Sequence, residues 1–231
     1  MASIRALLLD ADGVVQLPQP SWRSSLGALC GDPERTEDFL ADVLAAEKPC
    51  STGNADFKPA LASVLDQWRS TIPVEDALRI WTQIEPSADI LNLVRTLRSA
   101  GLSVALATNQ QAHRAHFMTT DLGYTKHFDH LFYSCELGHS KPSAEYFSSV
   151  LAEVMIDPAE ALFIDDHEAN VSAARECGLR SEVYHLSEGV GRFHEILKGY
   201  GLSSTRNGDA ADRKKRHTSS FRNLCATFPG R

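Results

Sequence analysis

The chain has 231 residues, of which 43% are hydrophobic and 23% are charged, a composition typical of a soluble globular protein that buries its own core. Its formal net charge of −7 is unevenly spread, because residues 203–231 carry a balance of +5 and residues 1–202 therefore carry −12. Such an acidic body repels nucleic acid and anionic membranes, and no apolar run is long enough for a signal peptide or a membrane span, so we expect neither partner and a cytoplasmic location.

In chain order, the first predicted element is a short buried strand over residues 4–9, which stops at Asp10. Helical periodicity then continues to about residue 85, with prolines at the joints. After that point helices alternate with further strands, predicted at 102–107, 131–133, 161–164 and 182–185. Among these helices, one follows from about residue 110 to 120 and another is opened by Pro142 at its first turn.

This alternation predicts an α/β fold, a three-layer, doubly wound parallel sheet with helices on both faces. Residues 1–17 and 87–202 are expected to form this Rossmann-like core domain, and residues 18–86 an inserted all-helical cap domain. Residues 203–231 lack periodicity and are expected to be a disordered basic tail.

Polar groups follow four of the predicted strands, where parallel sheets bind their ligands. They are Asp10 and Asp12 after the first strand, Thr108 and Asn109 after the second, Lys141 after the third, and Asp165 and Asp166 after the fourth. Because the carboxyl ends of parallel strands lie at the same edge of a sheet, we expect these side chains to line one pocket.

The residue types in this pocket indicate phosphoryl transfer. Crowded carboxylates repel one another unless a cation balances them, and Asp10, Asp12 and Asp166 favour Mg²⁺ shared with water and a substrate phosphate. Lys141 adds fixed positive charge for a phosphoryl group. Thr108 and Asn109, placed at the start of the predicted helix, add a hydroxyl, an amide and free backbone N–H groups. Aspartate is a known covalent acceptor for phosphoryl groups.

The same residues carry a family resemblance. Asp10-x-Asp12-Gly13-Val14, Ala107-Thr108-Asn109, Lys141-Pro142 and Phe163-Ile164-Asp165-Asp166 resemble, in order, the four signature motifs of the haloacid dehalogenase-like hydrolase superfamily. The family's plan accounts for residues 1–202, and residues 18–86 correspond to the cap inserted after its first motif, which closes over the site and selects the substrate.

The resemblance implies a Mg²⁺-dependent phosphatase of a small phosphorylated metabolite, and it implies a role for each motif residue. Asp10 attacks phosphorus and ligates the metal, and Asp12 protonates the leaving alcohol, activates water and offers its backbone carbonyl to the metal. Thr108 and the backbone of Asn109 hold the phosphoryl group. Lys141 neutralises the charges of both Asp10 and the transferring phosphoryl group. Asp166 is expected to ligate the metal with support from Asp165, although the sequence alone does not rank these two.

Other interpretations stay open at this point. A phosphomutase would use the same pair of aspartates, whereas a haloacid dehalogenase needs neither a metal nor Asp12. An inactive protein that binds phosphate or metal and regulates another is the non-enzyme alternative. Trp22, Arg23 and Lys48 are candidate substrate contacts in the cap. The substrate and the oligomeric state do not follow from the sequence.

Overall fold

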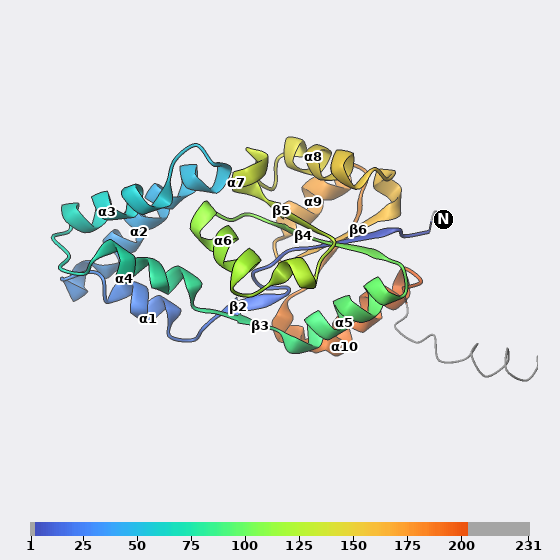
Figure 1. Ribbon diagram of the computed structural model, residues 1–231, viewed down its shortest axis with the longest axis horizontal. Coiled ribbons are helices and arrows are strands. Elements are labelled where there is room, and N and C mark those ends of the chain that lie inside the picture. Colours follow the sequence, from blue (N-terminus) through green and yellow to red (C-terminus); the bar gives the residue numbers. More distant parts are fainter. Residues whose placement is uncertain (1–2, 203–231) are drawn as a thin grey trace, which may run out of the picture.

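Short, buried apolar segments form the central sheet, as expected for strands that are covered on both faces. In residues 3–202, the part of the chain that the computed structural model describes, this sheet has five parallel strands (Figure 1). Their spatial order is β5 (His130–Tyr133), β4 (Ser103–Thr108), β1 (Ala6–Leu9), β6 (Ala161–Asp165) and β7 (Arg180–Val183). The strand order reverses on either side of the central β1, and open α/β sheets bind ligands at such a point.

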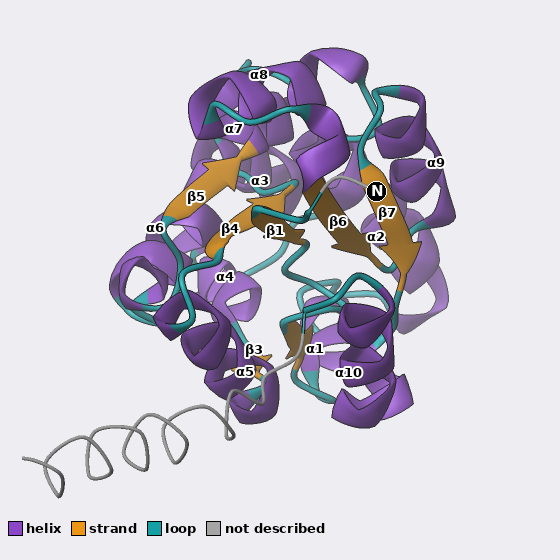
Figure 2. Ribbon diagram, turned by 90° about the vertical axis from the view of Figure 1, so that its right-hand side faces the viewer, coloured by secondary structure: helices purple, strands orange, loops and turns teal. Residues whose placement is uncertain are grey.

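Helices cover both faces of the sheet. Successive residues of each strand point to opposite sides, so each apolar strand presents side chains to be covered on both faces. In β1, Leu7 and Leu9 pack into one apolar cluster and Leu8 into another. The first cluster lies under α5 (Ala88–Ser99), α6 (Ala112–Thr120) and α10 (Gly189–Gly199), and the second under α8 (Ala144–Val154) and α9 (Glu168–Glu176). Figure 2 shows α5 and α10 on one side of the sheet and α8 and α9 on the other. The predicted three-layer α/β fold is confirmed.

Two element boundaries differ from the prediction. Pro142 does not open a helix in its first turn: α8 begins at Ala144, because the Ser143 side chain caps it by accepting a hydrogen bond from the backbone N–H of Tyr146 (3.3 Å). The last strand occupies Arg180–Val183 rather than residues 182–185, because the chain pairs with β6 almost immediately after Gly178 ends the preceding helix in a left-handed conformation.

The chain between β1 and α5 forms the predicted helical insertion. It contains α1 (Trp22–Gly27), α2 (Thr36–Glu47), α3 (Phe57–Gln67) and α4 (Val74–Leu78), joined by short 3₁₀ turns. These helices bury an apolar cluster of their own, in which the rings of Phe57 and Trp81 meet edge to face. In Figure 1 they form one end of the molecule, beyond α6 and α7 (Ser134–Leu137).

The sequence predicts an all-helical insertion at residues 18–86, but the ends of the insertion are not helical. Its two connections to the sheet domain are β2 (Gln16–Pro18) and β3 (Ile84–Pro86), which pair antiparallel with Gln16 opposite Pro86 and Pro18 opposite Ile84. Strands of three residues that contain prolines carry no alternating apolar pattern, so sequence periodicity does not reveal them. The two chain connections between the insertion and the sheet domain therefore run side by side.

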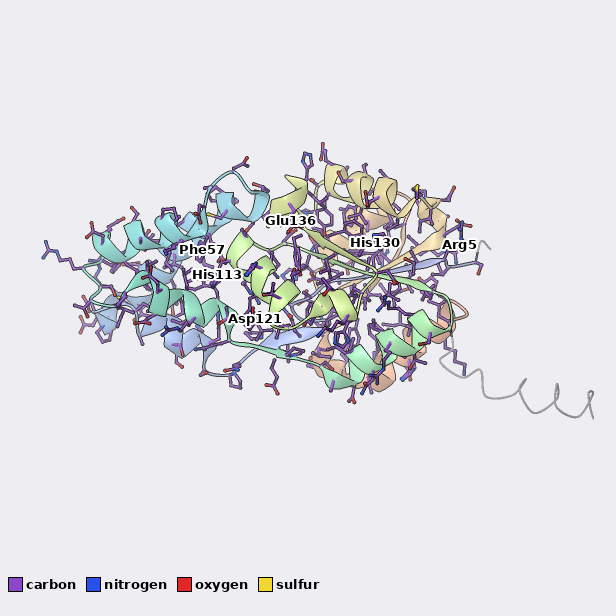
Figure 3. The ribbon with its side chains drawn as sticks, in the orientation of Figure 1. Arg5, Phe57, His113, Asp121, His130 and Glu136 are labelled. Carbon is purple, nitrogen blue, oxygen red and sulfur yellow. The ribbon has the colours of Figure 1, made fainter. Side chains whose placement is uncertain are left out.

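Further contacts hold the insertion against the carboxyl end of the sheet. The imidazole Nε2 of His113 on α6 lies 3.2 Å from the carbonyl oxygen of Leu78, and the hydroxyl of Ser134 donates to the carbonyl oxygen of Ser51. Figure 3 labels His113 at the end of α6 that is nearest the insertion. The insertion therefore sits over the strand ends where the motif residues lie.

The predicted basic tail, residues 203–231, lies outside the described residues. Within residues 3–202, no helix has both the length and the apolar character needed to span a bilayer.

Candidate active site

An ion-pair cluster lies at the carboxyl ends of the strands. Asp10 directly follows β1, Asp165 is the last residue of β6, and Lys141 reaches both from the connection between α7 and α8. The Lys141 Nζ atom is 2.8 Å from Asp10 Oδ1 and 2.6 Å from Asp165 Oδ2. Because β1 and β6 pair side by side in parallel, with Leu9 opposite Ile164, the two carboxylates end at the same level of the sheet.

Burial affects the pKa values of Asp10 and Lys141 in this cluster. The side chains of Lys141 and Asp165 are almost completely inaccessible to solvent, and that of Asp10 is 10% exposed. Burial raises the pKa of Asp10 to about 6 against the opposing charge of Lys141, and Asp165 adds to this rise. Burial also disfavours the charged form of Lys141, but Asp10 and Asp165 outweigh that effect and raise the pKa of its ammonium group. A single ammonium group is thus shared by two carboxylates.

The neighbouring aspartates of the last motif have different surroundings. Asp165 is fully engaged, since it also accepts hydrogen bonds from the Asn170 amide (3.0 and 3.1 Å) and from the backbone N–H of His167 (2.8 Å). Asp166 is 18% exposed, and its Oδ1 atom lies 2.7 Å from Nδ1 of His167. Among the described residues, Asp165, Asp166 and His167 offer ligand atoms that all lie within 4.8 Å of one another.

A glycine allows Asp166 to approach the first motif. Gly13 has a φ of +80°, and a Cβ atom at this position would stand 2.1 Å from Asp166 Oδ2. Any other residue would therefore be strained in its backbone and would overlap the carboxylate. The absence of a side chain at Gly13 keeps Asp166 beside the loop that carries Asp10 and Asp12.

Asp12 faces a different set of partners. Its carboxylate forms a two-pronged ion pair with Arg114, with Nη1–Oδ2 and Nη2–Oδ1 distances of 2.9 and 2.8 Å. It also accepts hydrogen bonds from the side-chain amides of Gln16 (3.0 Å) and Gln110 (2.8 Å). Burial acts to raise the pKa of Asp12, but Arg114 and the two amides outweigh it and lower this pKa below its usual range.

The second motif differs in part from expectation. Thr108 is buried at the end of β4, and its hydroxyl lies 3.2 Å from Gln110 Nε2. Asn109, however, is not at a helix start, because α6 begins at Ala112 after a side-chain cap by Gln111. The amide of Asn109 instead fixes the backbone of Lys141, accepting from its N–H (2.9 Å) and donating to its carbonyl oxygen (2.8 Å). This side chain positions the lysine.

Several residues at the site escape prediction from the sequence, namely Gln16, Glu47, Gln110, Gln111 and Arg114. For one of them a signal exists: Arg114 lies in the first turn of α6, where the helix dipole disfavours a cation unless an anion faces it. Among the cap residues proposed as substrate contacts, Arg23 pairs with Glu37 on the surface and Trp22 packs against the insertion's apolar cluster.

Comparison with known proteins gives a consistent picture. Residues 4–178 match the profile of the haloacid dehalogenase-like hydrolases. A sesquiterpene phosphatase of Aspergillus oryzae is 30% identical over 118 residues, which is 51% of this chain and 59% of that protein. An N-acetylmuramic acid 6-phosphate phosphatase of Pseudomonas aeruginosa is 23% identical over 189 residues, covering 77% of this chain and 80% of that protein. The chain spans 35% to 59% of the length of the first three curated relatives that it matches.

The fold is also that of solved structures. An HAD family enzyme of Bacteroides thetaiotaomicron, solved in complex with magnesium and inorganic phosphate, superimposes with a TM-score of 0.72 at 19% identity. The match covers 83% of this chain and 99% of that enzyme. At this level of identity, the similarity establishes the fold.

Proposed function

Because the chain belongs to the haloacid dehalogenase-like hydrolase family, we propose that it is a Mg²⁺-dependent phosphatase that hydrolyses a small phosphate monoester through an aspartyl-phosphate on Asp10. The observation that carries this proposal is the buried cluster in which Lys141 contacts both Asp10 and Asp165 at the carboxyl edge of the sheet. The phosphatases among the relatives and the phosphate bound to the Bacteroides enzyme support the same reaction class.

The residues present fit a magnesium ion. One lysine charge is shared by Asp10 and Asp165, so the carboxylate cluster that also contains Asp166 keeps an excess of negative charge. Gly13 leaves space for Asp166 beside the Asp10 loop, as a shared oxygen site requires. We propose Asp10, the backbone carbonyl of Asp12, and Asp166 as ligands, with Asp165 in support. When bound, the ion would neutralise carboxylate and phosphate oxygens and so favour attack on phosphorus.

The side chains divide the proposed reaction into two balanced steps. In the first, an Asp10 carboxylate oxygen bonds to phosphorus while the bond from phosphorus to the ester oxygen breaks. Asp12, which has to be protonated for this step, gives its proton to the leaving alkoxide. In the second, Asp12 takes a proton from water, whose oxygen attacks phosphorus and releases Asp10 and inorganic phosphate. Lys141 offsets charge on the transferring group, and Thr108 with the backbone of Asn109 binds its oxygens.

The test is hydrolysis of 4-nitrophenyl phosphate by the purified protein. We expect release of nitrophenol with Mg²⁺, its loss in EDTA and its recovery when Mg²⁺ is restored, because the carboxylate cluster needs a divalent cation to accept an anionic substrate. A panel of metabolite phosphates then identifies the substrate class. Equal rates in EDTA and in Mg²⁺ would contradict the metal dependence, and phosphoryl return to a sugar rather than to water would identify a mutase.

Replacing Gly13 by alanine tests the role of Asp166 in metal binding. The new methyl group would occupy the space of the Asp166 carboxylate, so we expect the Mg²⁺ affinity, measured by titration calorimetry, to fall roughly tenfold or more. The matched control is Gly101→Ala, which imposes a similar positive φ (+92°) but has no atom within 4 Å of the new Cβ. Unchanged affinity in Gly13→Ala would exclude Asp166 as a ligand.

A further inference from the structure

The carboxylate of Asp12 has no free position from which to act as an acid or a base. A carboxylate offers about four lone-pair sites. Among the described residues, Asp12 accepts four hydrogen bonds: Gln16 and Arg114 donate to Oδ1, and Gln110 and Arg114 donate to Oδ2. To exchange a proton with a leaving group or with water, Asp12 has to lose at least one of these donors.

Neither glutamine is free to leave. Gln16 is completely buried, and its Oε1 atom accepts a 2.7 Å hydrogen bond from the hydroxyl of buried Tyr124. Gln110 is 3% exposed, its Nε2 atom also reaches the Thr108 hydroxyl, and its backbone N–H is held by Ser134. Both amides are therefore fixed from a second side. Removing either one would leave buried polar groups without partners.

Arg114 is different, because it has an unused donor and a second acceptor nearby. Its Nε atom is buried without a hydrogen-bond partner. Glu47, the last residue of α2 in the insertion, lies close enough that the charge of Arg114 is the main influence opposing the rise in its pKa caused by burial. Gln111, which is 1% exposed and has an unpartnered Nε2 atom, also borders Glu47. Glu47 of the insertion is thus a second carboxylate on which the charge of Arg114 acts.

We propose that Arg114 is a positioning residue that exchanges between two carboxylates, Asp12 of the core and Glu47 of the cap. While Arg114 pairs with Asp12, the acid–base group is withheld. When the guanidinium turns to Glu47, Asp12 is released toward the substrate. This inference rests on the proposed phosphatase function for its catalytic consequence.

The kinetic test is a double-mutant cycle with Mg²⁺, using phenyl phosphate and 4-nitrophenyl phosphate. Glu47→Gln should keep Arg114 on Asp12 and lower kcat/KM for phenyl phosphate roughly tenfold, with a smaller loss for 4-nitrophenyl phosphate, whose better leaving group needs less protonation. The inhibition constant of inorganic phosphate should stay within about twofold. In an Arg114→Gln background, Glu47→Gln should have no further effect.

Matched variants separate this role from others. Glu37→Gln removes an exposed carboxylate from the same helix α2 and should leave kcat/KM for both substrates unchanged. Glu47→Asp keeps a carboxylate and should retain more activity than Glu47→Gln. Equal losses for the two substrates, or effects of Glu47→Gln and Arg114→Gln that simply add, would overturn the proposal and make Glu47 a direct substrate contact or a structural residue.

An NMR measurement that does not depend on catalysis tests this inference separately from the proposed function. In metal-free protein with ¹⁵N-labelled arginine, Asp12→Asn should send the guanidinium to Glu47 and shift the Nε–Hε resonance of Arg114. The shift should disappear in Asp12→Asn/Glu47→Gln. The same shift with and without Glu47 would overturn the exchange, whatever the activity. A shift that depends on Glu47 in a protein without phosphatase activity would support the exchange and refute only the proposed reaction.

Discussion

Asp10→Asn is expected to lower the turnover of 4-nitrophenyl phosphate by about 10⁴-fold or more, because the amide cannot form the acyl phosphate through which the proposed reaction proceeds. The loss should come from chemistry and not from unfolding. Burial already disfavours the ionised form of Asp10, and Lys141 keeps Asp165 as a partner in the variant. The measurements are steady-state kinetics, thermal unfolding, and acid quenching of the wild-type enzyme during turnover followed by mass spectrometry of the peptide that contains Asp10.

The control for this variant is Asp89→Asn, which neutralises an exposed carboxylate in the first turn of α5, outside the Asp10–Lys141–Asp165 ion-pair cluster. It should retain wild-type turnover. Phosphate found on another residue after acid quenching, or activity surviving in Asp10→Asn, would refute the assigned nucleophile.

Lys141→Met is expected to destabilise the fold as well as to abolish activity. It removes the ammonium group that contacts both Asp10 and Asp165, and leaving buried charges without their partner costs about 3–5 kcal/mol. The free energy of unfolding in urea, measured without metal, should fall by this amount. Burial then acts on Asp10 without the opposing charge of Lys141, so the pKa of Asp10 should rise further in the variant.

A compensating variant separates the two effects. In Lys141→Met/Asp165→Asn one of the stranded carboxylates is neutral, so much of the lost stability should return while activity stays absent. If Lys141→Met unfolds at the same urea concentration as the wild type, the cluster does not contribute to stability as its burial implies. If it also keeps its activity, Lys141 has no part in the reaction.

The core of the site could be predicted because strand ends converge by a general rule. Asp10, Thr108 and Asp165 each follow or end a buried apolar run, and parallel pairing of such runs places their ends at one edge. Lys141 follows the same logic less directly, since it lies beyond a short helix after β5. The α/β fold was predictable for a related reason, because alternating buried strands and amphipathic helices have few ways to pack.

What could not be predicted depends on contacts between distant side chains. Arg114 meets Asp12 across 102 positions of the sequence, and only the tertiary fold brings Glu47 of the insertion within reach of the Arg114 charge. Charged residues on helices usually face solvent, so their types alone indicate nothing unusual. The hydrogen bonds between the Asn109 amide and the main chain of Lys141 were equally unpredictable, because such contacts leave no trace in residue order.

The paired strands β2 and β3 have a consequence for how such a protein can change over evolution. Pro18 and Ile84 lie opposite each other in this ladder, so the chain leaves the sheet domain and returns to it at neighbouring points. The apolar cluster between these points is separate from the clusters on the sheet. A different segment with its own core, or a tight turn of two residues, would fit between the same two strands without disturbing β1 or Asp10. The insertion can thus be replaced during evolution without altering the sheet edge that carries Asp10.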